Sequence, residues 1–203
     1  MSSAEPDWPA ILRATVSELG WLFGPLSREA WDSEAAHVGW NCHDTIGHIT
    51  SDLIRFAGQV AAAPRDHYVP FSFDLSRARG SDQLIEVMTM AGALLAGAVE
   101  VAPPDTVGWH PHGMFDARGF AAMGCAEALV HAHDVADGLG VPWQASDELC
   151  DPVIDVLFPQ ALPRPPEVSG HDLLLWATGR LVPPGLPVVT NWDYRAGARS
   201  PAP

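Results

Sequence analysis

Apolar residues recur every three or four positions in four long segments of this 203-residue chain, and this spacing restricts its fold more than any other feature. It places apolar side chains on one face of a helix, which must then be buried against another element. The segments are residues 8–24, 41–63, 84–98 and 117–139. Four helices of this length, joined by modest connections, predict an all-α protein built on an antiparallel four-helix bundle.

Residues that favour helix ends mark the limits of these segments. Gly24 and Pro25 end the first segment, and Asn41 is a good N-cap for the second. Pro103 with Pro104 closes the third, and Gly140 follows the fourth. A turn-rich stretch at 64–78 and a loop around Trp109 to Gly113 are expected between the helices.

Weaker patterns after the fourth segment predict a short appendage. We expect helices at about 147–157 and 170–181, followed by the extended stretch PVVTNWDY (187–194). Residues 1–145 would then form the bundle domain and residues 146–203 a helical and extended appendage packed on it. About eight residues at the C-terminus are expected to be flexible.

Charge and composition exclude several functional classes. A formal charge of −14 with no lysine argues against nucleic-acid binding, because it would repel a phosphate backbone. No stretch approaches the ~20 apolar residues that cross a membrane, and the N-terminus lacks the layout of a signal peptide. Three widely spaced cysteines suggest reduced thiols. We therefore expect a cytoplasmic protein without a membrane partner.

The fourth segment carries a polar stripe that could bind a metal ion. Glu127 and His131 are four residues apart, and Asp134 follows on the same helical face. An acid and an imidazole in this relation can share an ion once a third ligand arrives from a facing helix. They can equally form a hydrogen-bonded pair on a solvated face. The small and apolar residues around them favour an inward position, where a carboxylate needs a partner.

His48, in the second segment, is not singled out by its local pattern. It lies with Asp44, Ser51, Asp52 and Arg55 on a polar stripe, away from the apolar face of its helix. On this pattern alone it reads as a histidine at the boundary of the core or on the surface.

Two stretches carry a resemblance to a known family. WNCHDTIGHI (40–49) and EALVHAHDVADGLG (127–140) resemble the two signature segments of the DinB-like superfamily. They are most similar to its actinobacterial branch, the mycothiol-dependent maleylpyruvate isomerase-like N-terminal domains. LLLWATGR (173–180) and NWDY (191–194) also resemble this branch. The resemblance implies a DinB-like four-helix bundle.

The resemblance also implies a function. It assigns His48, Glu127 and His131 as ligands of a divalent metal, for which zinc is the first expectation and nickel or iron(II) are alternatives. It further implies mycothiol, a low-molecular-weight thiol, as a cosubstrate for isomerisation or S-transfer on a small organic electrophile. The isomerase itself has a distinct C-terminal domain that helps to form its active site, whereas the tail here is short, so maleylpyruvate is not carried over as the substrate.

Further residues are candidates for roles around such a site. Asp134 could orient a metal ligand, or it could make a helix contact. His110 and His112 could line the mouth of a pocket or supply a general base, although a plain turn is the simpler interpretation. His133 is interpreted as a packing or surface residue. The remaining candidates could wall a substrate pocket or simply fill the core: Trp40, Trp109 and Phe115.

Two other functions stay open beside a thiol-dependent enzyme. One is a thiol-independent metalloenzyme of secondary metabolism, of isomerase, cyclase or hydrolase type, whose ion acts as a Lewis acid on a small molecule. The other is a non-catalytic metal-binding or sensor protein, which would have a fourth protein ligand, for example His110 or His112, and no pocket beside the ion. A homodimer is a further possibility for a bundle of this kind.

Overall fold

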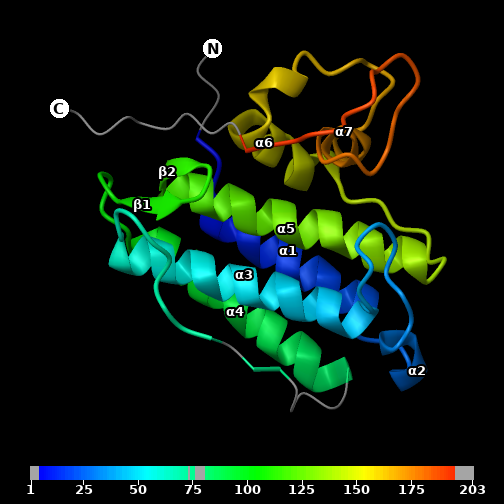
Figure 1. Ribbon diagram of the computed structural model, residues 1–203, viewed down its shortest axis with the longest axis horizontal. Coiled ribbons are helices and arrows are strands. Elements are labelled where there is room, and N and C mark those ends of the chain that lie inside the picture. Colours follow the sequence, from blue (N-terminus) through cyan, green and yellow to red (C-terminus); the bar gives the residue numbers. More distant parts are fainter. Residues whose placement is uncertain (1–4, 73, 76–80, 195–203) are drawn as a thin grey trace.

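The computed structural model describes residues 5–72, 74–75 and 81–194, and in this part of the chain helices dominate (Figure 1). The predicted flexible C-terminal residues lie outside the described part. The helices are α1 (Trp8–Phe23), α2 (Arg28–Trp31), α3 (Cys42–Ala62), α4 (Ser81–Val101), α5 (Ala117–Gly138), α6 (Asp147–Leu157) and α7 (Gly170–Ala177), with one 3-10 turn, η1 (Pro159–Ala161). Two short strands, β1 (Val107–His110) and β2 (Gly113–Asp116), complete the fold. The all-α prediction is confirmed.

The four long helices form the predicted bundle. α3 packs against α4 and α5, and α1 packs against the same two helices from the other side. Local capping sets where they begin, since the side chain of Asn41 accepts a hydrogen bond of 2.7 Å from the backbone N–H of Asp44 at the start of α3. Asp116 caps α5 in the same way through the N–H of Gly119 at 2.8 Å.

Helix α5 is buried on more than one side. α1 and α3 cover it within the bundle, while α6 and α7 lie together over its outer side (Figure 1). The residues along it are therefore mostly small, and sixteen positions between Gly119 and Ala136 are buried. Small residues let the neighbouring helices approach closely. Because several helices cover α5, it lacks the division into an apolar face and a polar face that α3 has.

Helix α4 corrects one expectation. Residues Asp82–Val101 are long and apolar enough to cross a membrane by length and composition, although the sequence was expected to have no stretch of this kind. In the structure α4 packs along α1 and α3 as a bundle helix. A helix in the core of a water-soluble protein passes the same test. The absence of a membrane partner stays a prediction.

Two other segments also differ from expectation. The loop predicted around Trp109 is a β-hairpin, in which His110 pairs with Gly113 across a two-residue turn. Helix α7 ends at Ala177 instead of about residue 181, because Gly179 adopts a left-handed backbone conformation with φ +74° and its N–H bonds back to Trp176. The stretch 187–194, expected to be extended and packed on the bundle, forms neither helix nor strand and has Tyr194 buried.

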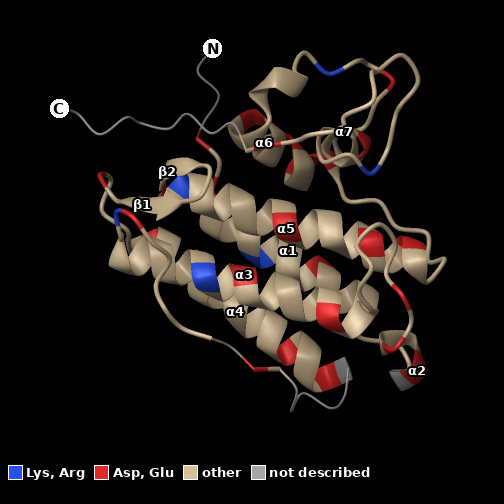
Figure 2. Cartoon of the chain, in the orientation of Figure 1, with Lys and Arg blue, Asp and Glu red and all other residues tan. Residues whose placement is uncertain are grey.

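Acidic residues are spread over the bundle and the appendage, with few basic residues between them (Figure 2). The formal charge of −14 was expected to disfavour nucleic-acid binding. Among the described residues that Figure 2 shows, no basic face offsets this charge. The three cysteines, Cys42, Cys125 and Cys150, are buried and unpaired. Burial raises the pKa of the Cys42 thiol, which disfavours its reactive thiolate form.

Candidate metal centre

Three side chains from two neighbouring helices meet beside the middle of α5. His48 comes from α3, and Glu127 and His131 come from successive turns of α5. Glu127 Oε2 lies 3.4 Å from His48 Nε2 and 3.3 Å from His131 Nε2. All three donor atoms lie within 4.8 Å of one another. The structure therefore brings together the three residues that the resemblance named.

The chemistry of these donors fits a divalent transition metal. Two imidazole nitrogens and one carboxylate oxygen are the ligand types that zinc and similar ions take in proteins. Donors bound to one zinc ion at about 2.0–2.1 Å lie about 3.3 Å apart in a tetrahedral arrangement. The two separations that involve Glu127 are already of this size. His48 on α3 would supply the third ligand that Glu127 and His131 on α5 need in order to share an ion.

The electrostatics of the centre keep Glu127 ionised. Burial alone would raise the pKa of this carboxyl group, but hydrogen bonds with His131, His48 and Tyr194 lower it. Burial alone would lower the pKa of His131, whereas its hydrogen bonds with Asp134 and Glu127 raise that pKa to about 9. The site thus concentrates negative charge that a cation must balance, either a proton on imidazole or a metal ion.

Asp134 holds the far side of the His131 ring. Its Oδ2 lies 2.9 Å from His131 Nδ1, and because an ionised carboxylate can only accept, Nδ1 carries the proton and Nε2 is left to face Glu127. Arg180 in turn donates to both oxygens of Asp134, at 3.2 and 3.4 Å. Asp134 is fully buried, and this arrangement is the one by which proteins orient metal-binding histidines.

Two polar residues at the centre were not predicted. Tyr194 donates a hydrogen bond of 2.6 Å to Glu127 Oε1. Asp52, one turn after His48 on α3, places Oδ2 3.3 Å from His48 Nε2 and also pairs with Arg55 at 2.9 Å. Burial and the nearby Glu127 raise the pKa of Asp52 to about 6. Spacing along α3 could have indicated Asp52, whereas no local pattern points to Tyr194.

A cavity of about 320 Å³ opens beside the three candidate ligands. Trp40 stands over them, with its ring centroid 5.0 Å from that of His48. The volume is within the range of small-molecule sites. Besides the three ligands, its walls are Val38, Trp40, Ala126, Val130, Thr178, Arg180, Trp192 and Tyr194. Of the aromatic residues expected to wall a pocket, Trp40 does so, while Phe115 is buried against Phe120.

His110 and His112 lie in the hairpin and contact Tyr194, which in turn contacts Glu127. Both rings lie beside Tyr194, with centroids 6.0 and 5.8 Å from it, and neither residue is among those lining the cavity. His110 is buried, and its Nδ1 accepts the backbone N–H of His112 at 3.2 Å. His112 pairs with Asp193 at 2.5 Å. Neither histidine belongs to the cluster formed by the three candidate ligands.

A known protein family matches most of the bundle. Residues 12–136, more than half of the sequence, match the family described as the mycothiol maleylpyruvate isomerase N-terminal domain. The chain belongs to this family. The matched region runs from α1 through most of α5 and includes His48, Glu127 and His131. The predicted resemblance to mycothiol-dependent maleylpyruvate isomerase-like N-terminal domains is confirmed. No curated protein matches the sequence.

Solved structures show the same fold at low sequence identity. The mycothiol-dependent maleylpyruvate isomerase matches with a TM-score of 0.59 at 14% identity, over 85% of this chain and 88% of that chain. A histidine-to-alanine mutant of that enzyme gives a TM-score of 0.60 at 15% identity, with the same coverage. YfiT from Bacillus subtilis matches with a TM-score of 0.51 at 12% identity, over 70% of this chain and 92% of that chain. It is described as a probable metal-dependent hydrolase with an unusual four-helix bundle topology. The isomerase alignments extend beyond residues 12–136, so the likeness includes part of the appendage.

Proposed function

We propose that this protein is a metal-dependent enzyme that uses a small thiol, of which mycothiol is the first expectation, to isomerise or conjugate a small organic electrophile. The observation that carries this proposal is the cluster of His48, Glu127 and His131 at the wall of an accessible cavity. Three protein ligands beside an open space are typical of catalytic metal sites, whereas structural sites are closed by four. Zinc is the expected ion, with nickel or iron(II) as alternatives.

The side chains around the ligands would hold the metal and its substrate in place. Asp134 orients His131, Tyr194 orients Glu127, and Trp40 covers the ligands from one side. An ion held there lowers the pKa of a thiol or a water molecule and polarises a carbonyl oxygen. The aromatic walls of the cavity would exclude bulk water from the reacting groups and hold the apolar part of a substrate.

Arg180 gives the cavity one positively charged wall. It lines the cavity and pairs with the buried Asp134, and its Nη1 donates to the carbonyl of Thr178 at 2.9 Å. These bonds fix the guanidinium close to the three ligands. We therefore expect the electrophile or the thiol to carry an acidic group, such as a carboxylate, that Arg180 attracts.

The relatives support two versions of this chemistry. The isomerase named above is mycothiol-dependent, which favours the thiol. YfiT is described as a probable metal-dependent hydrolase, which favours the second candidate, a metalloenzyme that needs no thiol. A non-catalytic metal-binding or sensor role is less favoured, because it expects a fourth protein ligand and no cavity beside the ion.

Metal analysis tests the centre itself. After dialysis we expect purified wild-type protein to retain about one divalent ion per chain more than His48→Ala and more than Glu127→Ala. Circular dichroism would verify that both variants are folded. Equal metal content in the wild-type protein and both variants would show that no ion is bound at these residues.

Cobalt substitution tests the thiol. When Co²⁺ is loaded into the wild-type protein, addition of mycothiol should produce a thiolate-to-cobalt charge-transfer absorption, and His48→Ala should not show it. If no such absorption develops, and turnover of an ester or epoxide substrate proceeds equally well in thiol-free buffer, the hydrolase-type candidate replaces the thiol-dependent one. Turnover that requires the thiol supports the proposal.

A further inference from the structure

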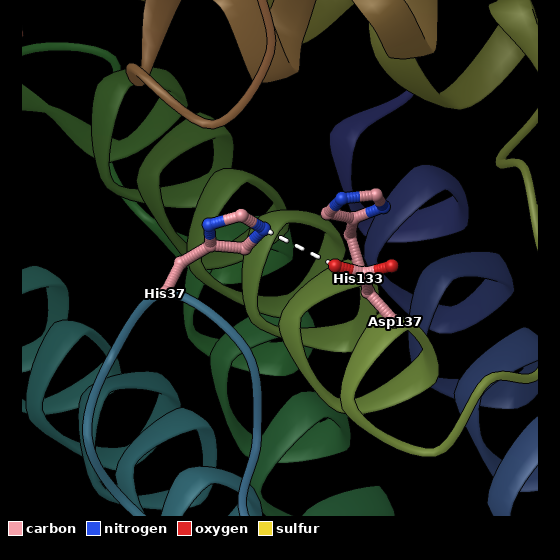
Figure 3. Close-up of side chains that lie close together, drawn as sticks. All are labelled: His37, His133 and Asp137. Carbon is pink, nitrogen blue, oxygen red and sulfur yellow. Dashed lines mark ion pairs between the residues drawn. The ribbon is translucent and has the colours of Figure 1, made fainter.

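A second cluster of metal-ligand residues lies near the end of α5 (Figure 3), and none of its three members lines the cavity. His133 and Asp137 project from successive turns of α5, and His37 reaches them from the loop between α2 and α3. His37 Nε2 lies 3.3 Å from Asp137 Oδ2, and one ligand atom from each of the three residues lies within 4.8 Å of the other two. None of these residues belongs to the centre described above.

Backbone contacts hold the loop against α5 at this point. The N–H of Ala36 donates to the carbonyl of Asp134 on α5 at 2.8 Å, while the N–H of Ala35 donates to the carbonyl of Trp40 within the loop at 2.9 Å. Gly138 allows this approach, because a Cβ there would collide with the backbone oxygen of Glu34. The loop that carries His37 is thus positioned without help from the His37 side chain.

The two imidazole rings are also oriented by their surroundings. His37 has a left-handed backbone with φ +65°, a conformation uncommon for residues other than glycine. Its ring stacks near His133, with centroids 6.0 Å apart and planes inclined by 14°. The ring of the buried His171 also contacts His133 and stands nearly perpendicular to it, with centroids 5.5 Å apart. His133, interpreted from the sequence as a packing or surface residue, therefore contacts the rings of two other histidines.

We propose that His37, His133 and Asp137 form a second site for a divalent transition metal such as zinc. Two of the three donors are imidazoles, which favour zinc, copper or nickel over magnesium or calcium. The 3.3 Å separation of His37 and Asp137 already matches two ligands of one zinc ion, and small rotations of His133 would close the third. Because His37 and Asp137 are exposed, water can fill the remaining positions and the ion can exchange.

An ion at this site would connect the loop to α5. Val38 and Trp40, which follow His37 in that loop, line the cavity beside the first centre. The second ion would therefore fix one wall of the cavity without touching its contents. The inference does not depend on the proposed function, because it rests on other residues.

The test counts zinc ions in protein that lacks the first centre. In the background His48→Ala with Glu127→Ala, titration against a chromophoric zinc chelator should reveal one remaining equivalent. Adding His37→Asn should weaken this binding at least tenfold, and Asp137→Asn should act similarly. Asparagine tolerates the left-handed conformation, so His37→Asn removes the imidazole and leaves the loop undisturbed. The matched control is His67→Asn, because His67 pairs with Asp66 at 2.6 Å and belongs to neither three-residue cluster.

The outcomes separate the two sites. One equivalent in the background, lost with His37→Asn and kept with His67→Asn, supports the second site. No equivalent in the background, or the same affinity with His37→Asn, overturns it. If the wild-type protein and the background bind equal amounts, the first centre fails while the second stands. As an independent measurement, zinc should slow amide hydrogen exchange across residues 35–40 in the background and not in its His37→Asn variant.

Discussion

Tyr194 donates a hydrogen bond of 2.6 Å to Glu127 across 67 positions of sequence. The bond connects the last described residue of the chain to the carboxylate at the centre of the bundle. Tyr194 is buried among aromatic rings, including those of Phe158 and Trp192. Burial and the charge of Glu127 raise its pKa well above the ordinary value of a tyrosine, so its hydroxyl stays a donor. The C-terminal stretch is therefore part of the candidate metal centre.

Replacing Tyr194 by phenylalanine should weaken metal binding at this centre. Glu127 Oε1 would lose its donor, and a hydrogen bond to a charged group contributes about 1.5–3 kcal/mol, so we expect zinc affinity to fall about tenfold or more. Competition with a chromophoric chelator measures this in the His37→Asn background, where only the first centre is counted. The chain's other tyrosine supplies the control, because Tyr68→Phe should leave the affinity unchanged. Equal affinities for the two variants would contradict a role for the Tyr194 hydroxyl.

Asp134→Asn should reduce zinc affinity by about 10–100-fold, the usual effect of losing a carboxylate that orients a metal-binding histidine. Hydrogen bonds with His131 and Arg180 lower the pKa of Asp134, although its burial would raise it, so the wild-type group is ionised. Asparagine keeps the size of the side chain and removes the charge. The same chelator competition measures the change, and Asp155→Asn on α6 removes an equal charge from an exposed position. If both variants bind zinc like the wild-type protein, Asp134 serves packing alone.

Contacts between residues close together in the sequence could be predicted, whereas contacts between distant residues could not. The start of α3 was predictable because Asn41 caps a residue three positions away. The pairing of Glu127 with His131 was predictable because both lie on one helical face. His48 reaches Glu127 from another helix, and its polar neighbours on α3 gave no reason to choose it. Only the resemblance of two separated segments to a known family identified it.

The features that the sequence did not predict depend on tertiary contacts. The hairpin consists of two four-residue strands whose turn, Pro111 and His112, lacks the usual Asn-Gly signal. Arg180 reaches Asp134 because Gly179 ends α7 early and turns the chain back. The glycine could have been recognised as a helix C-cap, but the partner of the arginine could not, because 46 positions separate the two charges.

Two glycines in α4 should respond in opposite ways to alanine. A Cβ at Gly92 would lie 2.5 Å from Val16 Cγ1, so Gly92→Ala should lower the free energy of unfolding by about 1–3 kcal/mol through overpacking. A Cβ at Gly97 would meet nothing within 4 Å, and Gly97→Ala should raise that free energy by about 0.5–1 kcal/mol because alanine favours the helix. Urea unfolding followed by circular dichroism measures both. Destabilisation of similar size at the two positions would argue against close packing of α1 on α4.

Acidification should destabilise the metal-free protein through His110. Burial, together with the neighbouring His112, lowers the pKa of His110 to about 4, whereas an unfolded histidine titrates near 6.5. Between these values the unfolded chain binds a proton that the folded chain does not bind, so the free energy of unfolding falls as the pH falls. From pH 7 to pH 5 this contribution decreases by about 2 kcal/mol.

The measurement compares pH dependence and not absolute stability, because replacing a buried histidine also changes packing. Urea unfolding of wild-type protein and of His110→Gln, at pH 7 and pH 5 with chelator present, gives the change for each. We expect the decrease to be about 2 kcal/mol smaller in the variant, since glutamine does not titrate. The same decrease in both proteins would mean that His110 binds its proton equally well in the folded and unfolded chain, and that the hairpin does not exclude water from its ring.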